Sequence, residues 1–323
     1  MPLESIRTLV QADLDATDQF ISGELLSDIP LINKLTKHIF SAGGKRIRPM
    51  LALLSANTFG QPHQQQHIFL AAAIELIHTA TLLHDDVVDS STLRRGNQTA
   101  NDIWGNEASV LVGDFLYSRA FQLVVGLKNF DIIDIFAAAT HLMAEGEVMQ
   151  LANCHDPDVT EESYYDVIHR KTAKLFEIAS HAGALLSQPA QTQTEAIKTY
   201  GIALGTAYQL IDDAMDYHSS TNEMGKNTGD DLAEGKPTLP LIYAMQNATT
   251  ADTKILREAI CTGSRKNLKA ILSIIESTGA IQYTAAAAKK QAQQAIESLS
   301  VIPESPYRQA LTHLAEFVVS RTY

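Results

Sequence analysis

The sequence predicts an all-α protein. Its ten prolines leave two long stretches without proline, residues 63–156 and 241–302. Both stretches are rich in Ala, Leu, Gln, Glu and Ile, most of which favour helices. Alternating runs of β-branched residues between turn signals, which would indicate strands, are almost absent. No low-complexity linker divides the sequence, so we expect one helical domain over residues 1–323, with a smaller helical appendage at about residues 245–323 as the alternative.

The composition excludes several classes of protein. Hydrophobic residues make up 45% and charged residues 19% of the chain, as in globular proteins that bury a core. The formal net charge of −12 argues against a nucleic-acid binder, which needs a basic face. The two cysteines, Cys154 and Cys261, show no CxxC spacing, so we expect neither a thiolate zinc site nor a disulfide framework.

Neither the N-terminus nor the most apolar run has the pattern of a membrane or export segment. The first residues, MPLESIRTLVQADLD, carry early acids and lack the apolar region of a signal peptide. The run over residues 68–88 is interrupted by acids and histidines, which a membrane span rarely tolerates. We therefore expect no transmembrane segment and a cytoplasmic location.

A helix over residues 67–89 is predicted to be buried, because its sequence, HIFLAAAIELIHTATLLHDDVVD, is apolar nearly all round. It ends in a DDxxD motif. Residues i and i+4 of a helix share a face, so Asp85 and Asp89 point the same way, and His78 lies on that face about two turns earlier. Carboxylates that end a buried helix repel each other and resist desolvation, and a bound divalent cation relieves both effects.

A second DDxxD motif closes another apolar helix, KTYGIALGTAYQLIDDAMD, over residues 198–216. Its aspartates are Asp212, Asp213 and Asp216, and Gln209 lies almost one turn before them. All-oxygen ligands suit a hard cation such as Mg²⁺. A single DDxxD is also typical of a solvated acidic helix end, but two copies that each end an apolar helix favour metal binding.

Cations are placed where a diphosphate would need them. In GGKRIRP the glycines permit a tight loop, and Pro49 fits the first position of a following helix. Lys45, Arg46 and Arg48 therefore crowd a helix N-terminus, which favours anions. Further candidates are Arg94, Arg95, Lys171 beside Thr172, Lys226 and Lys236. Each alone could be an ordinary surface charge, but their joint occurrence favours a diphosphate site.

Six motifs together resemble a known family. GGKRIRP, LLHDDVVDSSTLRRG, GEVMQL, RKTAKLF, YQLIDDAMD and GKNTGDDLAEGKPTLPLI occur in the order found in the trans-type isoprenyl diphosphate synthases. The resemblance is dense over about residues 30–245 and is greatest to the bacterial long-chain branch that includes the octaprenyl diphosphate synthases. It implies a homodimer whose large helical bundle surrounds a central apolar cavity, with the DDxxD motifs facing each other across its mouth.

The resemblance also implies roles for single residues. Isopentenyl diphosphate would be held by Lys45, Arg48, His78 and Arg95. The allylic diphosphate, farnesyl or similar, would be held by Arg94, Lys171, Thr172, Gln209, Lys226 and Lys236. Mg²⁺, about three ions per site when substrate is bound, would be held by Asp85, Asp89 and Asp212, with support from Asp86 and Asp216. The motifs show no departure that would indicate an inactive copy.

The implied reaction is chain elongation. A diphosphate leaves an allylic carbon, the double bond of isopentenyl diphosphate attacks, and a proton is lost. Metal ions and cationic side chains stabilise charge on the leaving oxygens, so no side-chain nucleophile is needed. In the family, the near floor of the product tunnel lies five and four residues before the first aspartate, here Ala80 and Thr81. Neither is aromatic, so we expect a long product, octaprenyl diphosphate by resemblance, for quinone side chains.

Other assignments remain open at this stage. A deeper floor could be formed by Leu76, Ile77 or Phe121, and Ala80 could equally be a small residue required by core packing. A short-chain farnesyl or geranylgeranyl diphosphate synthase, a terpene cyclase and a non-catalytic prenyl-binding subunit are the competing functions. The complete second DDxxD and the GGKRIRP loop argue against the cyclase, and two intact aspartate motifs argue against a non-catalytic subunit.

Overall fold

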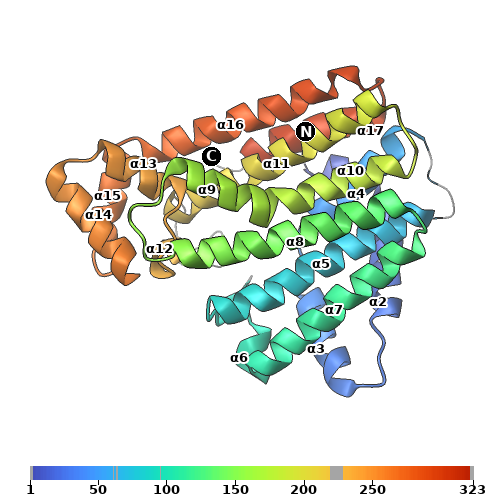
Figure 1. The fold of residues 1–323 in the computed structure, drawn as a ribbon, viewed down its shortest axis with the longest axis horizontal. Coiled ribbons are helices and arrows are strands. Elements are labelled where there is room, and N and C mark those ends of the chain that lie inside the picture. The colour runs from blue at the N-terminus through green and yellow to red at the C-terminus, as the bar shows by residue number, and fades with distance from the viewer. Residues whose placement is uncertain (1–2, 61, 63–64, 95, 219–227, 321–323) are drawn as a thin grey trace. The chain divides into compact units, whose positions relative to one another are not determined.

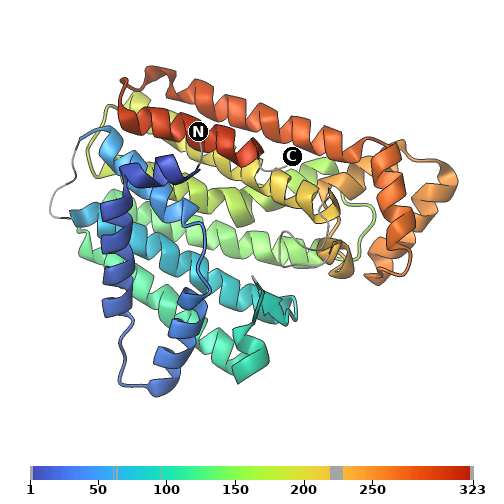
Figure 2. The same cartoon turned by 180° about the vertical axis from the view of Figure 1, so that it is seen from behind.

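The computed structural model describes the whole chain except residues 1–2, 61, 63–64, 95, 219–227 and 321–323 (Figures 1 and 2). The described part is almost entirely helical, and its single sheet is a short antiparallel hairpin of β1 (Leu93–Arg94) and β2 (Asn97–Gln98). The predicted all-α class is therefore confirmed.

Two compact units make up the chain. Unit 1 consists of residues 1–138, 175–199 and 299–314, and unit 2 consists of residues 139–174, 200–298 and 315–323. The single domain expected from the sequence stays a prediction, and each unit is described by itself.

Unit 1 contains the N-terminal helices and the first DDxxD motif. Its elements are α1 (Leu3–Leu9), α2 (Gln11–Glu24), α3 (Pro30–Ser41), α4 (Ile47–Thr58), α5 (Gln66–Val88), the β1–β2 hairpin, α6 (Ala100–Trp104), α7 (Asn106–Gly126) and the beginning of α8 (Phe130–Asn153). It also takes α10 (Lys174–Leu185) from residue 175, the start of α11 (Gln191–His218), the 3-10 turn η3 (Leu299–Val301) and α17 (Pro306–Ser320) as far as residue 314.

Helix α5 forms the core of unit 1, as its apolar sequence predicts. It contacts α2 and α4, and α7 runs beside it (Figure 1). Every residue from Leu70 to Ile77 is buried. Gly113 of α7 allows a close approach, since a Cβ there would lie 2.3 Å from Nε2 of His84 on α5.

By length and composition alone, α5 and α7 could each cross a membrane. In α5, 67% of the most apolar window is buried inside the structure, against 39% in α7. Buried core helices have the same length and composition, so the pattern is weak evidence for a membrane span. The expected absence of a transmembrane segment stays a prediction.

The GGKRIRP loop differs from the sequence expectation in one respect. Helix α4 begins at Ile47, two residues before Pro49, and Arg46 is its N-cap. Proline is still tolerated, because the first N–H groups of a helix have no partner within it. Arg48 therefore belongs to the first turn of α4 and not to the loop.

Unit 2 contains the second DDxxD motif. It takes α8 from residue 139, α9 (Glu161–Ile168), a five-residue π-helical turn η2 (His169–Ala173), α11 from residue 200, α12 (Asp230–Ala233), α13 (Leu239–Asn247), α14 (Thr250–Thr262), α15 (Leu268–Ser277) and α16 (Ala280–Ser298). Tyr217 and Leu232 share a buried cluster with Leu256, Ile260 and Ile271. Residues 250–277 therefore pack into a core common to α11 and α12.

Candidate functional site

The predicted site residues fall into two sets, one in each unit. The first-motif set lies in unit 1 and comprises Lys45, Arg48, His78, Asp85, Asp86, Asp89 and Arg94. The second-motif set lies in unit 2 and comprises Lys171, Thr172, Gln209, Asp212, Asp216 and Lys236. Arg95 and Lys226 lie outside the described residues.

The first motif divides its carboxylates between two directions. Asp85 and Asp89 are half-buried, and the N–H of Asp89 donates to the carbonyl of Asp85 at 2.8 Å. The helical geometry therefore continues through the motif, and these two side chains share a face. Asp86 is 1% exposed and accepts a hydrogen bond from Nε of Arg94 at 2.7 Å. Burial raises the pKa of Asp86, although Arg94 opposes the shift.

Arg48 and His78, for which the resemblance predicts a shared ligand, lie in contact. Nη1 of Arg48 is 3.2 Å from Nε2 of His78. The guanidinium of Arg48 also lies over the ring of Phe176, 4.6 Å from its centroid, an arrangement that fixes the plane of the guanidinium. Lys45 is exposed just before the N-cap of α4. Arg48 on the first turn of α4 and His78 on α5 thus lie together in the unit that contains the first DDxxD.

A small pocket in unit 1 opens beside these residues. It is lined by His38, Ile39, Phe40, Ala42, Gly43, Arg46, Glu75, His78, Thr79, Leu82, Asp86, Arg94 and residues 97–100. The pocket brings together the GGKRIRP loop, α5 and the β1–β2 hairpin. Three of the predicted site residues, His78, Asp86 and Arg94, therefore face one hollow.

The two predicted chain-length positions differ in burial. Ala80 is fully buried within unit 1. Thr81 is half-buried, and its hydroxyl donates to the carbonyl of His78 at 2.9 Å. Leu76 and Ile77, the candidates one turn deeper, are fully buried as well.

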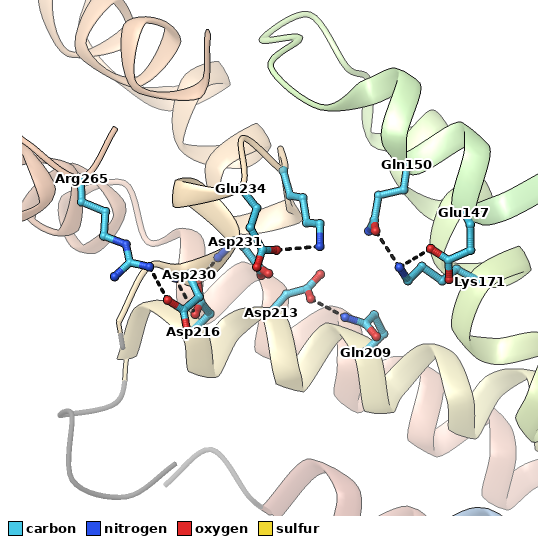
Figure 3. Close-up of polar contacts among 11 residues, drawn as sticks. Glu147, Gln150, Lys171, Gln209, Asp213, Asp216, Asp230, Asp231, Glu234 and Arg265 are labelled. Atoms are coloured by element: carbon cyan, nitrogen blue, oxygen red, sulfur yellow. Dashed lines mark hydrogen bonds and ion pairs between the residues drawn. The ribbon is translucent and has the colours of Figure 1, made fainter. Parts of the chain in front are cut away.

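In the second-motif set, Gln209 bonds to the buried Asp213 (Figure 3) and also to Thr172. The hydroxyl of Thr172 donates to Oε1 of Gln209 at 3.0 Å, and Nε2 of Gln209 donates to Oδ1 of Asp213 at 2.6 Å. The phenol of Tyr164 donates to Oδ2 of the same carboxylate. Burial, followed by the charge of Asp231, raises the pKa of Asp213 to about 8.

Asp213 and Tyr164 were missed by the sequence interpretation. The second aspartate of the motif, Asp213, is buried on α11, whereas Asp212 and Asp216 are only partly buried. Helical spacing turns Asp213 by about 100° from Asp212, a signal that could have suggested a different environment for it. Nothing local marked Tyr164, which lies on α9 and reaches Asp213 only in the folded chain.

Lys171 and Thr172 occupy the π-helical turn η2, a feature that is frequent at functional sites. Nζ of Lys171 donates to Glu147 and, at 2.8 Å, to Oε1 of Gln150, both on α8 (Figure 3). Gly146 allows this approach, because a Cβ there would lie 2.7 Å from the backbone nitrogen of Lys171. The structure thus explains the GEVMQL motif as the partner surface of η2.

Asp216 and Lys236 are held by the segment around α12. The backbone N–H groups of Asp230 and Asp231 each donate to the carboxylate of Asp216 at 3.2 Å. Burial, followed by the charge of Asp231, raises the pKa of Asp216 to about 8. Nζ of Lys236 is 2.6 Å from Oε2 of Glu234.

The donor set fits a hard cation bound together with a phosphate. Among the described residues, no group of three His, Cys, Asp or Glu side chains is arranged to hold a metal ion. Each motif instead offers carboxylates one helical turn apart, Asp85 with Asp89 and Asp212 with Asp216. Mg²⁺ is commonly bound by one or two carboxylates and completes its shell with phosphate oxygens and water.

Comparison with known proteins places the chain in a family. The polyprenyl synthetase family profile matches residues 29–276. The octaprenyl diphosphate synthase of Haemophilus influenzae is 47% identical, over 100% of this chain and 98% of that protein. An all-trans-nonaprenyl-diphosphate synthase (geranyl-diphosphate specific) of Rhodobacter capsulatus is 44% identical, over 98% of each.

Solved structures agree with this similarity. The crystal structure of a polyprenyl synthase from Caulobacter crescentus CB15, complexed with calcium and isoprenyl diphosphate, aligns with a TM-score of 0.96 and 40% identity, over 100% of this chain and 98% of that chain. The ordered motifs, the helical fold and the full-length similarity lead to one conclusion: this chain belongs to the polyprenyl synthetase family.

Proposed function

We propose that the chain is a Mg²⁺-dependent all-trans-polyprenyl diphosphate synthase that makes octaprenyl diphosphate for quinone side chains. The observation that carries the proposal is its 47% identity over the full length to an octaprenyl diphosphate synthase. The paired carboxylates and clustered cations of both motif sets support it. Each set combines the oxygen donors of a hard cation with the cationic donors of a diphosphate.

The two substrates would be held by different sets of side chains. Isopentenyl diphosphate would be held by Lys45, Arg48, His78 and Arg95. The allylic diphosphate, farnesyl or similar, would be held by Arg94, Lys171, Thr172, Gln209, Lys226 and Lys236. Arg48 and His78 are already in contact, and Gln209 is already oriented by Thr172 and Asp213. Such preorganisation lowers the cost of fixing a charged ligand.

Mg²⁺ would be held by Asp85, Asp89 and Asp212, with support from Asp86 and Asp216, and when bound it would stabilise negative charge on the leaving diphosphate. The C. crescentus relative was crystallised with calcium and isoprenyl diphosphate, which supports joint binding of cation and substrate. Asp86 contributes through Arg94, whose guanidinium it orients. The protein cations neutralise the remaining charge of the diphosphates.

We also propose that the enzyme is a cytoplasmic homodimer. Helix α7 exposes the large apolar side chains of Val110, Leu111 and Val125. Exposed apolar residues on one helix support a subunit interface. Analytical ultracentrifugation of the purified protein would give the mass of a dimer, and a monomer at micromolar concentration would contradict the proposal.

Mass spectrometry of the product tests the activity. Purified protein is incubated with Mg²⁺, farnesyl diphosphate and labelled isopentenyl diphosphate, and the extracted products are compared with Asp85→Ala and Asp212→Ala controls. Octaprenyl diphosphate is the expected main product, and both controls should lose turnover while remaining folded. Farnesyl or geranylgeranyl diphosphate as the final product, a cyclised hydrocarbon or no turnover would each contradict the proposal.

A further inference from the structure

Arg46 adopts a backbone conformation that its residue type disfavours. As the N-cap of α4 it has φ 52° and ψ 33°, in the left-handed region. A residue with a Cβ pays a free-energy cost there that glycine avoids. Such strain persists only where the surroundings fix the residue. The side chain of Arg46 should therefore make contacts that compensate for its backbone.

The side chain of Arg46 makes three such contacts, to α5, α2 and α3. Nη1 pairs with Oε1 of Glu75 on α5, and Nε lies 3.3 Å from Oδ1 of Asp18 on α2. The guanidinium also lies over the ring of Phe40 on α3, 5.6 Å from its centroid. The side chains of Arg46 and Glu75 are only 12% and 7% exposed. Breaking a buried pair leaves one charge without compensation, so the contact strongly constrains the loop.

A second contact between α4 and α5 lies near the Arg46–Glu75 ion pair. Glu75 and His78 are three residues apart on α5 and share a face, and Arg48 lies against His78. The two arginines that flank Ile47 thus tie the start of α4 to Glu75 and His78, which lie about one turn apart on α5. Arg46 and Glu75 both line the pocket that His78, Asp86 and Arg94 also line.

The charge of Arg46 is paired with acidic side chains inside unit 1. Two acids neutralise it, whereas Lys45 beside it is exposed. Arg46 and Phe40 also form a wall between the small pocket and a neighbouring cavity of about 520 Å³ between α2 and α3. The charge of Arg46 is already paired with acidic side chains of the protein, and its side chain separates two cavities. Arg46 is therefore suited to hold the loop in place and poorly suited to bind a ligand.

We propose that Arg46 and Glu75 are positioning residues for isopentenyl diphosphate. Their ion pair fixes the left-handed turn before α4 and sets the register of that turn against α5. Lys45, Arg48 and His78 are thereby held in the arrangement that the diphosphate requires. The inference rests on the proposed function, in which these three residues bind isopentenyl diphosphate.

The test compares single and double variants of the pair. Glu75→Gln keeps the side-chain shape but removes its charge. Arg46→Gly/Glu75→Gln removes both charges and also places glycine where the left-handed backbone suits it. Each variant is measured for melting temperature, for KM of both substrates and for the Kd of isopentenyl diphosphate by calorimetry. Glu24→Gln is the matched control, because it breaks the ion pair with Arg119 in the same unit, away from the loop.

The single variant should raise the KM and Kd for isopentenyl diphosphate about tenfold or more, as removal of an outer-shell partner commonly does. The KM for the allylic substrate should stay within about twofold. In the double variant the melting temperature should recover while the KM for isopentenyl diphosphate stays high, because the turn is no longer tied to α5. Glu24→Gln should leave both KM values unchanged.

Two results would overturn the positioning role. One is an isopentenyl diphosphate KM that returns to the wild-type value in the double variant together with the melting temperature, since the pair would then serve stability alone. The other is an equal rise of both KM values in Glu75→Gln. Failure of the wild-type protein to bind isopentenyl diphosphate in calorimetry would instead contradict the proposed function, which keeps the two failures distinct.

Discussion

Gln209 and Asp213 are joined by a 2.6 Å hydrogen bond in which the amide of Gln209 donates to the buried carboxylate. The bond fixes the orientation of the amide, so that its oxygen accepts from Thr172. Asp213 in turn accepts from Tyr164. The second aspartate of the second DDxxD motif therefore orients Gln209, a residue of the predicted allylic diphosphate site, without belonging to that site itself.

The first prediction concerns Asp213→Asn. Burial raises the pKa of Asp213 to about 8, so the comparison is made above that pH. There both carboxylate oxygens accept from donors, and an amide would set its own NH₂ against one of them. An unmatched buried donor costs about 1–3 kcal/mol. We expect a lower melting temperature and a KM for the allylic substrate about tenfold higher. Tyr164→Phe, which removes one donor and leaves the Gln209 bond, should have a smaller effect on KM. An unchanged allylic KM in Asp213→Asn would contradict the positioning of Gln209.

The second prediction separates Asp86 from Asp85. Asp86 is buried against Arg94, whereas Asp85 is half-buried on the face that it shares with Asp89. Asp85→Asn should lower kcat by about 100-fold or more, because the proposed Mg²⁺ site would lose an oxygen ligand. Asp86→Asn should mainly raise the KM for the allylic substrate, by about 10-fold to 100-fold, as expected for an outer-shell partner. Steady-state kinetics over a Mg²⁺ titration distinguishes the two, and identical profiles would contradict the division of roles.

The third prediction concerns the contact between α8 and the π-helical turn. A Cβ at Gly146 would lie 2.7 Å from the backbone nitrogen of Lys171 and 2.8 Å from Cβ of Arg170. Gly146→Ala should therefore lower the free energy of unfolding by about 1–3 kcal/mol. Gly126→Ala on α7 is the matched control, because nothing lies within 4 Å of its added Cβ. Denaturant unfolding gives the free energy of unfolding of both variants. Equal values would show that η2 can shift away from the added Cβ without loss of stability.

The fourth prediction concerns pH. Partial desolvation lowers the pKa of His169 at the start of η2, although the residue keeps substantial solvent exposure and the nearby Asp166 opposes the shift. Because the folded pKa lies below the unfolded value of about 6.5, His169 contributes stability above that value and loses it as the pH falls through the folded pKa. His169→Gln should therefore weaken the fall in melting temperature between about pH 7 and pH 5. An unchanged slope in His169→Gln would contradict the prediction.

Much of the fold and the family could be predicted from the sequence, because they depend on local patterns. The apolar run of α5 predicted a buried helix ending at the first DDxxD, and the structure confirms it at Gln66–Val88. The six ordered motifs predicted the family, which the full-length similarity confirms. The roles assigned to single site residues stay predictions.

Contacts between distant segments could not be predicted in the same way. Glu75 and Arg46 were each visible in the sequence, but their pairing depends on the packing of α5 against the start of α4. Tyr164 and Asp213 meet only through the packing of α9 on α11. The close approach of η2 to α8 at Gly146 likewise joins segments that are distant in the sequence.

The last prediction concerns product length. Ala80 lies on the fully buried part of α5, five residues before Asp85. If the growing chain passes this position, Ala80→Phe should block it and shorten the product by one or more isoprene units. Each helical turn rises by about 5.4 Å, which is comparable to the length of one isoprene unit. Leu76→Phe, made as a separate variant one turn deeper, should therefore give a product about one unit longer than Ala80→Phe does.

The alternative for Ala80 is that core packing alone requires a small side chain. Overpacking would then lower stability by about 1–3 kcal/mol without changing which product forms. Mass spectrometry of the product, together with the melting temperature of each variant, separates the two explanations. Because both positions are fully buried, a loss of stability is expected in either case, and only the product length decides. An unchanged product from folded Ala80→Phe would show that the chain does not grow past this face of α5.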